Sequence, residues 1–553
     1  MGDLEADIRR IAMGSAAVHG STTARIVLAK LLGSRPDLRG RAAEIMDTVQ
    51  HIVQQVNEMD SSELAEFKPI RKMQSKRQSL PPLPDATHGN VVLRFPPEPN
   101  GYPHIGHAKA AIINDEYAKM YGGKLVLRMD DTNPAAERLE FYAALKVGLE
   151  WLGVSFSSVK NTSDDMELLH NKAAELIHRG MAYVCECSRE ESSKNRQDKV
   201  YCPCSRLTPE ENHTRWVRMQ TKYKPGKAVL RYRGDMTSDN TTMRDPVLFR
   251  IIHDKHPLLD TRYRTWPSYD LAIAIEDSVD GITHALRSKE YEMRNVLYNS
   301  IQESLGLRKS RVMVFSRLAL KDMPVSKRLI KPLLERGHIS SYDDPRLPTL
   351  AGLRRRGITP QAIRKFILSL GFTKSDTIAP FETLESYNRS MIDAVSVRLH
   401  MVQDYMTFSI TGTAGPAQLP DLPGSDDAKR RLDPTSGIML NASDVSDGDM
   451  VLLMGLGTAH VDAASRHITM QSGIPHSDLP RIHWVPVSGA TQVRLLVPQP
   501  PFVDEKFDQD SLRVFTCMVE PYFASLPDYT MIQFVRFGYA RKESARQAVF
   551  AHK

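Results

Sequence analysis

The feature that most constrains the fold is a strand, a turn, a helix and a second strand that follow one another early in the chain. Residues 91–95 are apolar except for Arg94, as in a buried strand, and residues 96–101 are rich in proline and glycine. A helical pattern then covers about 106–121 and ends at a glycine pair, before a second apolar strand at 124–129. A βαβ unit of this kind requires a parallel sheet with a right-handed crossover.

A chemical motif spans the turn of this unit. Its sequence, from residue 94 to residue 107, is RFPPEPNGYPHIGH. Parallel sheets bind nucleotides where a strand ends and the next helix begins, because free N–H groups and the helix dipole favour phosphate there. His104 and His107 can donate hydrogen bonds to phosphate oxygens, and Gly106 lets an adenine ring approach the backbone. The motif therefore predicts an ATP site.

A cysteine cluster indicates a metal site. The chain has five cysteines, and four of them form two short pairs, Cys185 with Cys187 and Cys202 with Cys204. Two chelating pairs across a loop can present four thiolates tetrahedrally to zinc, and four thiolates leave no open position for catalysis. Structural zinc is the favoured interpretation, and unligated thiols or a redox pair are the alternatives.

Composition excludes several classes of protein. No window approaches the roughly 18 consecutive apolar residues of a membrane span, and the acidic start of the chain is wrong for a secretory signal. The 73 basic and 66 acidic residues give a net charge of +7, which allows either a polyanionic partner or an ordinary solvated surface. We expect a cytoplasmic, multidomain protein with no membrane partner.

Further motifs give the chain a family resemblance. They follow the first in the order LRMDDTNP (127–134), WPSYD (266–270), GITHALR (281–287), VSKR (325–328), DDPR (343–346) and LRRRG (353–357). Together they resemble the signatures of class I aminoacyl-tRNA synthetases of the glutamyl/glutaminyl branch. Within that branch the chain is most similar to the archaeal type of glutamyl-tRNA synthetase.

The resemblance implies that ATP and L-glutamate form an adenylate, whose glutamyl group passes to the terminal adenosine of tRNA(Glu). His104 and His107 would stabilise the transferring phosphate, Gly106 would face the nucleotide, and Mg²⁺ would arrive on the ATP phosphates. Lys327 would neutralise the leaving pyrophosphate, with Ser326 and Arg328 completing the ATP-binding loop. The family's second signature usually starts with another lysine, where this chain has Pro324.

The resemblance also assigns the amino-acid pocket. Asp130 would face the substrate ammonium, Tyr269 would supply a hydroxyl, and Arg94 would reach the substrate side chain. Arg287 stands where glutamyl enzymes have arginine and glutaminyl enzymes a small uncharged residue, so it favours glutamate over glutamine. The rival interpretations are a glutaminyl-tRNA synthetase and a non-catalytic tRNA-binding paralogue. A small nucleotidylyltransferase fails on length and on the tRNA-branch motifs.

The resulting prediction is a multidomain chain around a Rossmann-type catalytic domain, with a zinc-containing insertion and a C-terminal β-barrel region. The expected domains are a helical N-terminal extension with linker (1–88), the first catalytic half (89–184), the connective insertion (185–265), the second catalytic half (266–328), a helical domain (329–405) and the anticodon-binding β-region (406–553). The β-region is expected to be an antiparallel β-domain or a pair of barrels. The basic run at 354–356 is expected either to contact tRNA phosphates or to be a solvated face. Charging of tRNA(Gln) for a separate amidotransferase is a further alternative.

Overall fold

The computed structural model describes most of the chain. The described residues are 2–19, 21–34, 38, 42–59, 80–323, 327–412, 415–425, 429–471, 479–504 and 506–553. The chain divides into two compact units, Met1–Ser79 and Leu80–Lys553. No helix among these residues is long and apolar enough to cross a membrane.

The first unit contains the helices α1 (Gly2–His19), α2 (Ala24–Ser34) and α3 (Ala42–Asn57). Their apolar stripes meet in one core, in which Ile8, Val27 and Val49 are fully buried. At the start of α2, Thr22 donates its backbone N–H to Asn57 Oδ1 over 2.9 Å, which ties the end of α3 to α2. The unit is a small helical bundle with a core of its own.

The second unit begins with the predicted βαβ element. Strand β1 (Val92–Phe95) pairs in parallel with β2 (Lys124–Met129), and α5 (Ile105–Met120) connects them. β2 pairs in parallel with β3 (Ser158–Asn161), which follows α6 (Leu139–Trp151). The predicted parallel sheet is therefore confirmed, and its apolar residues pack with α5 in one core.

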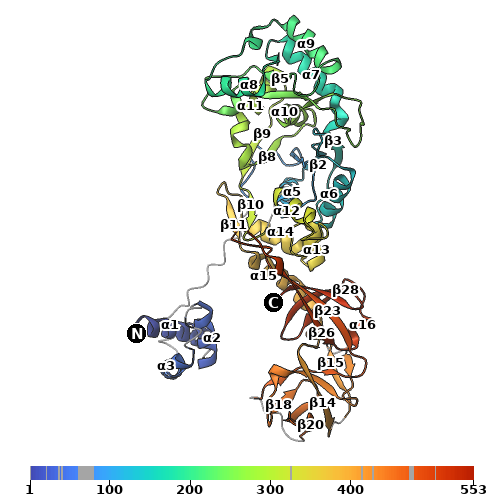
Figure 1. The fold of residues 1–553 in the computed structure, drawn as a ribbon. Helices are drawn as coiled ribbons and strands as arrows, with labels where there is room; N and C mark the ends of the chain where they lie inside the picture. The colour runs from blue at the N-terminus through green and yellow to red at the C-terminus, as the bar shows by residue number, and fades with distance from the viewer. Residues whose placement is uncertain are drawn as a thin grey trace. The chain divides into compact units, whose positions relative to one another are not determined.

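A second parallel pair extends this sheet (Figure 1). It consists of β8 (His284–Ser288) and β9 (Arg311–Phe315), which flank α11 (Asn295–Ser304) and follow α10 (Tyr269–Val279). The backbone N–H of Thr283 donates to Val92 O over 2.9 Å, so β8 lies beside β1. The strand order is therefore β3-β2-β1-β8-β9, and β1, β2, β8 and β9 all end at the same edge.

Between the two halves, the chain forms an antiparallel sheet with helices around it. Its strands are β4 (Ala182–Cys185), β5 (Val229–Tyr232), β6 (Val247–Ile251) and β7 (Thr265–Pro267). The helices are α7 (Met166–His178), α8 (Arg189–Gln197) and α9 (Pro209–Thr221). Ser188 and Thr208 cap α8 and α9 through their side-chain oxygens, as their residue types favour.

Four helices follow the parallel strands: α12 (Lys327–Glu335), α13 (Leu350–Arg356), α14 (Pro360–Ser369) and α15 (Phe381–Ile392). A short strand pair, β10 (Leu318–Leu320) with β11 (Thr377–Ala379), lies among them. α13 begins at Thr349, whose hydroxyl accepts the N–H of Gly352, and ends at Gly357 in the left-handed conformation that glycine favours. These helices connect the catalytic part to the C-terminal sheets.

Among the described residues, two seven-stranded sheets contain most strands of the C-terminal part. The first comprises β12 (Val397–Leu399), β13 (Met401–Val402), β23 (Thr491–Pro498), β26 (Leu512–Val519), β27 (Met531–Phe534), β28 (Gly538–Ser544) and β29 (Gln547–His552). The second comprises β14 (Tyr405–Thr411), β17 (Ile438–Asn441), β18 (Met450–Leu453), β19 (Gly457–Asp462), β20 (His467–Met470), β21 (Arg481–Ile482) and β22 (Val485–Pro486). Two short pairs lie outside these sheets, β15 (Ala417–Pro420) with β16 (Lys429–Leu432) and β24 (Phe502–Val503) with β25 (Lys506–Phe507).

The expectation of a purely antiparallel β-region is wrong. β12 pairs in parallel with β27, β14 with β20, β18 with β21 and β23 with β29. The alternation of apolar residues marks where strands lie but does not determine which distant strand each will pair with. The sheets also begin before residue 406, because β12 and β13 belong to the first of them.

Candidate active site

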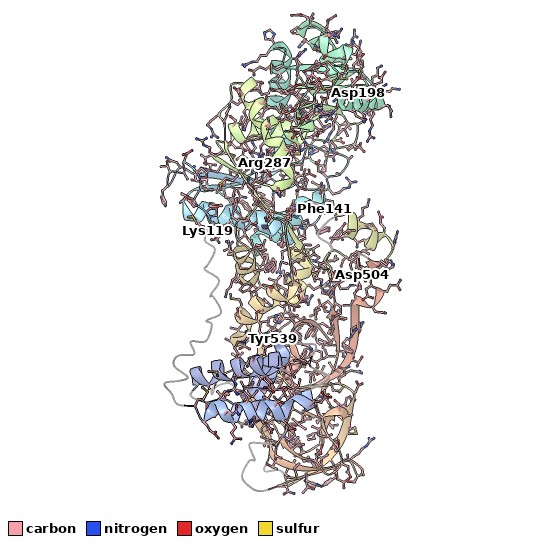
Figure 2. All side chains as sticks on the ribbon, turned by 90° about the vertical axis from the view of Figure 1, so that its left-hand side faces the viewer. Lys119, Phe141, Asp198, Arg287, Asp504 and Tyr539 are labelled. Carbon is pink, nitrogen blue, oxygen red and sulfur yellow. The ribbon has the colours of Figure 1, made fainter. Side chains whose placement is uncertain are left out.

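A cavity of about 530 Å³ opens where β1, β2, β8 and β9 end. Seven of the residues singled out in the sequence line it: Arg94, His104, Gly106, His107, Asp130, Tyr269 and Arg287. They come from both halves of the parallel sheet, and Arg287, from the second half, is marked in Figure 2. The fold thus brings together side chains that lie up to 193 positions apart, counting from Arg94 to Arg287.

The two histidines shape the start of α5. His104 is its N-cap, and its Nδ1 accepts the backbone N–H of Gly106 over 3.0 Å. His107 Nδ1 in turn accepts the backbone N–H of His104 over 3.2 Å. The rings lie 4.0 Å apart between centroids. Each imidazole therefore satisfies one of the free N–H groups that a helix start leaves.

Burial keeps both rings neutral, and these bonds determine which ring nitrogen carries the proton. Burial, and then the nearby His107, lower the pKa of His104 well below 6.5, and burial lowers the pKa of His107 to about 4. Both rings are neutral at pH 7, and because each Nδ1 accepts a hydrogen bond, each proton lies on Nε2. Two neutral Nε2–H donors are thus available beside a helix N-terminus, which suits hydrogen bonding to a phosphate without added charge.

Gly106 is required by its neighbour as well as by any ligand. A Cβ at this position would lie 2.8 Å from His104 Cε1 and 3.0 Å from its Nδ1. A larger residue would displace the His104 ring from its capping position. The expected approach of adenine to the backbone is one reason for glycine here, and the histidine ring is a second.

Arg287 is buried without a carboxylate partner in the described part of the chain. Its Nη1 donates to Asn295 Oδ1 over 3.0 Å and its Nη2 to the Tyr269 hydroxyl over 3.3 Å. Its Nε has no hydrogen-bond partner among the described residues. Only 3% of the residue is exposed, so its positive charge has lost most of its water, and no described carboxylate lies within ion-pair distance of it. The Asp270 carboxylate, which pairs with Arg294, acts on this charge from farther away. A buried guanidinium in this state is prepared for an anionic ligand.

Arg94 is compensated in part. Its Nε donates to Asp277 Oδ1 over 3.1 Å and its Nη1 to Leu286 O over 2.7 Å. Its Nη2 is buried and, within the described residues, has no partner. Asp277 is shared with Arg128, whose Nη2 lies 2.5 Å from the same oxygen, so Arg94 keeps part of its charge for a ligand.

Asp130 is a buried carboxyl group without a cation that fully compensates it. Burial and the nearby Glu98 carboxylate raise the pKa of Asp130 to about 8, and Arg128 offsets this only in part. A carboxylate in this position gains greatly from an added cation. Tyr269 interacts with both kinds of charge: burial raises its pKa, Arg287 acts in the opposite direction, and Asp130 adds to the increase. The cavity therefore combines a carboxyl without a sufficient cation with two incompletely compensated arginines. The other charged residues of its lining are Glu98, Glu290, Lys109 and Arg317.

Lys109 is a cavity residue that sequence reasoning missed. It lies on α5, is 2% exposed, and donates from Nζ to Ser316 O over 2.6 Å and to Ser316 Oγ over 3.0 Å. Burial lowers the pKa of Lys109 to about 8, with Asp376 acting in the opposite direction. A lysine buried on the core side of a helix start is the signal that could have revealed it. Tyr291 and Arg317 also line the cavity without having been predicted.

The second-signature loop lies largely outside the described residues. Pro324 and Ser326 lie outside the described residues, as do the side chains of Lys327 and Arg328, whose backbone begins α12. Ile330, from the same helix, lines the cavity, so the start of α12 lies beside the site. The predicted contacts of this loop with ATP stay predictions.

The four clustered cysteines come together as a candidate metal centre. All four Sγ atoms lie within 4.8 Å of one another, with Cys185 3.9 Å from Cys202 and Cys187 4.0 Å from Cys204. Four sulfurs at about 2.3 Å from a tetrahedral zinc would be about 3.8 Å apart. The thiols are free of disulfides and close a loop beside β4. The donor set and its spacing therefore fit zinc.

The basic run at the end of α13 is largely structural. Arg356 donates to Glu385 Oε1 over 2.7 Å and to Ala551 O over 2.9 Å. Arg355 forms an ion pair with Glu543. Only Arg354 is exposed with no side-chain partner among the described residues. Arg355 and Arg356 are each held by a carboxylate of this chain, so the run as a whole is not a solvated face. Contact of the run with tRNA phosphates stays a prediction.

Comparisons with known proteins agree with this site. Residues 90–394 match the catalytic domain of the class I tRNA synthetases for glutamate and glutamine, and residues 481–543 match the anticodon-binding domain of the same group. The chain belongs to this family of class I tRNA synthetases.

Two relatives that align over their full length have a more specific name than the family. The chain is 51% identical to the glutamate–tRNA ligase of Cenarchaeum symbiosum (strain A) and 48% identical to that of Nitrosopumilus maritimus (strain SCM1), each over 100% of both chains. A solved glutamate tRNA ligase from Elizabethkingia meningosepticum, in complex with its amino acid, aligns with TM-score 0.41 and 19% identity over 56% of this chain and 70% of that one. That similarity is too distant to support an argument.

Proposed function

We propose that the chain is a glutamate–tRNA ligase, which forms glutamyl-adenylate from L-glutamate and ATP and transfers the glutamyl group to the 3′-terminal adenosine of tRNA(Glu). The observation that carries the choice of glutamate is the charge pattern of the cavity. Two buried arginines, Arg94 and Arg287, are incompletely compensated, and Asp130 lacks a sufficient cation.

Free glutamate has the complementary charges. It carries two carboxylates and one ammonium, which match the two incompletely compensated arginines and Asp130. Glutamine offers a neutral carboxamide in place of the second carboxylate, so one buried guanidinium would stay uncompensated. Charge compensation therefore favours glutamate and disfavours glutamine at the same position.

In the first step, a carboxylate oxygen of glutamate attacks the α-phosphorus of ATP, the bond to the β-phosphate oxygen breaks, and pyrophosphate leaves. The neutral Nε2–H groups of His104 and His107 can donate to the phosphate oxygens as charge develops. We assign Lys327 to neutralisation of the pyrophosphate and Ser326 and Arg328 to the same ATP-binding loop. Mg²⁺ bound to the ATP phosphates would supply further neutralisation of charge.

In the second step, a ribose hydroxyl of the terminal adenosine attacks the carbonyl of the adenylate and AMP leaves. The tRNA would extend from the cavity to the C-terminal sheets, where the anticodon-binding match lies. We keep the sequence-based division into domains, with the β-region starting at β12 instead of residue 406. Charging of tRNA(Gln), with a separate amidotransferase to convert it, and a cytoplasmic location stay predictions.

We assign a structural zinc ion to Cys185, Cys187, Cys202 and Cys204. The support is the approach of all four Sγ atoms within 4.8 Å in a part of the chain whose local core is small. Binding there would fold the loop between β4 and β5. Elemental analysis of protein purified without chelator should give about one zinc per chain. Absence of metal together with four freely titrating thiols would remove the site.

Aminoacylation assays test the proposed function directly. Purified tRNA(Glu) and tRNA(Gln) transcripts are each incubated with ATP and with labelled glutamate or labelled glutamine. Attachment of glutamate to tRNA(Glu) is the expected result, and glutamate on tRNA(Gln) would add the second substrate. A preference for glutamine would support the glutaminyl rival, and no charging of either tRNA would support the non-catalytic one.

A further inference from the structure

One buried carboxylate is linked to Arg94 directly and to Arg287 through a tyrosine. Asp277, on α10, is fully buried. Its Oδ1 accepts from Arg94 Nε over 3.1 Å and from Arg128 Nη2 over 2.5 Å, and its Oδ2 accepts from the Tyr298 hydroxyl over 2.9 Å. A single side chain therefore holds residues of β1, β2 and α11 at once.

Tyr298 links Asp277 to Arg287. The Tyr298 ring lies 5.1 Å from the guanidinium carbon of Arg287, within the range of a cation–π interaction. Because its hydroxyl is bonded to Asp277, the ring cannot rotate away from that position without losing a buried hydrogen bond. Asp277 thus contacts Arg94 directly and supports Arg287 through Tyr298.

The two arginines that share Asp277 differ in their other partners. Arg128 has a second carboxylate, Asp280, at 2.5 Å, whereas Arg94 has only the Leu286 carbonyl besides Asp277. Burial raises the pKa of Asp277, but Arg94 and Arg128 outweigh it, so the pKa lies below its usual value and the carboxylate is ionised at pH 7. Asp277 therefore fixes Arg94 in place without cancelling its charge.

We propose that Asp277 is the positioning residue for both arginines of the glutamate site and, through them, sets the selectivity for glutamate over glutamine. Asp277 does not line the cavity, so it acts only through the side chains that do. The inference rests on the proposed function, because it assigns Arg94 and Arg287 to the substrate carboxylates.

Three matched variants test the proposal by pyrophosphate exchange in the presence of tRNA, with KM measured for glutamate and for ATP. Asp277→Asn should raise the KM for glutamate by about 30-fold or more and leave the KM for ATP within about threefold. Asp280→Asn removes a neighbouring carboxylate of the same network, which contacts Arg128 and Lys160 but neither cavity arginine. It should leave both KM values within about threefold. The thermal midpoint of each variant reports any general loss of stability.

Tyr298→Phe tests the link from Asp277 to Arg287 separately, since it keeps the ring beside Arg287 and removes only the hydroxyl. It should raise the KM for glutamate by about three- to tenfold, and the ratio of glutamate to glutamine use should fall. Equal KM values for Asp277→Asn and Asp280→Asn would overturn the proposal. If Asp277→Asn does not fold, an unchanged KM in Tyr298→Phe overturns it instead. Failure of the unmodified enzyme to use glutamate would reject the proposed function, which is a separate outcome.

Discussion

Two buried arginines, one at the end of β8 and one at the end of α13, have opposite surroundings. Arg356 is 5% exposed and has Glu385, the Ala551 carbonyl and the Phe381 ring, 4.6 Å from its guanidinium carbon, as partners. Arg287 is 3% exposed and, within the described residues, has one amide oxygen, one hydroxyl and tyrosine rings around it. Burial is nearly the same, but only one of the two charges is compensated.

The difference separates a structural arginine from one that is prepared for a ligand. Ionised groups are buried at a cost of several kcal/mol unless an opposite charge is close. At Arg356 the chain supplies that charge from α15, so the residue joins elements of the fold. At Arg287 the described part of the chain places no carboxylate within ion-pair distance, so we expect the substrate to supply the anion.

The largest expected effect comes from Arg287→Met. Loss of the guanidinium should lower kcat/KM for glutamate by about 10²- to 10³-fold, because truncating one member of a buried charge pair costs about 2–5 kcal/mol. The thermal midpoint should change little, since no carboxylate of the protein loses a partner. Charging assays and a thermal melt of the same preparation measure both. A large loss of stability with full activity would show that Arg287 is structural.

The same substitution at the other site, Arg356→Met, should give the reverse pattern. Glu385, which is half-buried, would lose its cation, and we expect this to destabilise the fold by about 2–4 kcal/mol. The KM for glutamate should stay unchanged, because Arg356 lies away from the cavity lining. Denaturant unfolding of the variant beside the unmodified protein gives the free energy. Unchanged stability would contradict the distinction between the two arginines.

This contrast also shows where sequence reasoning was sufficient. The βαβ unit could be predicted because its signals are local: an apolar run, a turn and a helix stop within about forty residues. The ordered motifs then located seven residues of one cavity.

What could not be predicted depends on partners that are distant in the sequence. Arg356 is neutralised by Glu385 and by a carbonyl of β29, and nothing in the local run of arginines indicates this. The parallel pairings in the C-terminal sheets fail for the same reason, because strand patterns specify faces and not neighbours. Lys109 was missed because its burial follows from tertiary packing against Ser316.

Asp130 gives the complementary test, since it is an anion without a sufficient cation. With a pKa of about 8, it is mostly protonated at pH 7, and ionisation should improve binding of the substrate ammonium. The KM for glutamate should therefore fall by about five- to tenfold between pH 7 and pH 8.5. Asp130→Asn should abolish this dependence. A KM that does not change with pH in the unmodified enzyme would remove the role.

The same carboxyl has a predictable effect on stability. Its pKa is higher in the folded state than the usual 3.8, so the folded state holds the proton more tightly. Between about pH 4 and pH 8 the folded state therefore binds more protons than the unfolded state, and this contribution to stability falls as the pH rises. The difference in thermal midpoint between the unmodified protein and Asp130→Asn, followed against pH, isolates it.

The smallest expected effect concerns Arg354, the one arginine of the α13 run that is exposed with no side-chain partner among the described residues. A solvated arginine that meets a phosphate contributes through counterion release, so Arg354→Ala should weaken tRNA binding by about two- to threefold and lower the slope of log affinity against log salt by about 0.7–1. Arg355→Met is the control, because Arg355 is already paired with Glu543 and should leave the slope unchanged. Binding titrations at several salt concentrations measure both slopes. An equal loss of slope in the two variants would show that an ion pair within the protein does not prevent an arginine from binding tRNA. The distinction between paired, structural arginines and arginines prepared for a ligand would then fail at this surface.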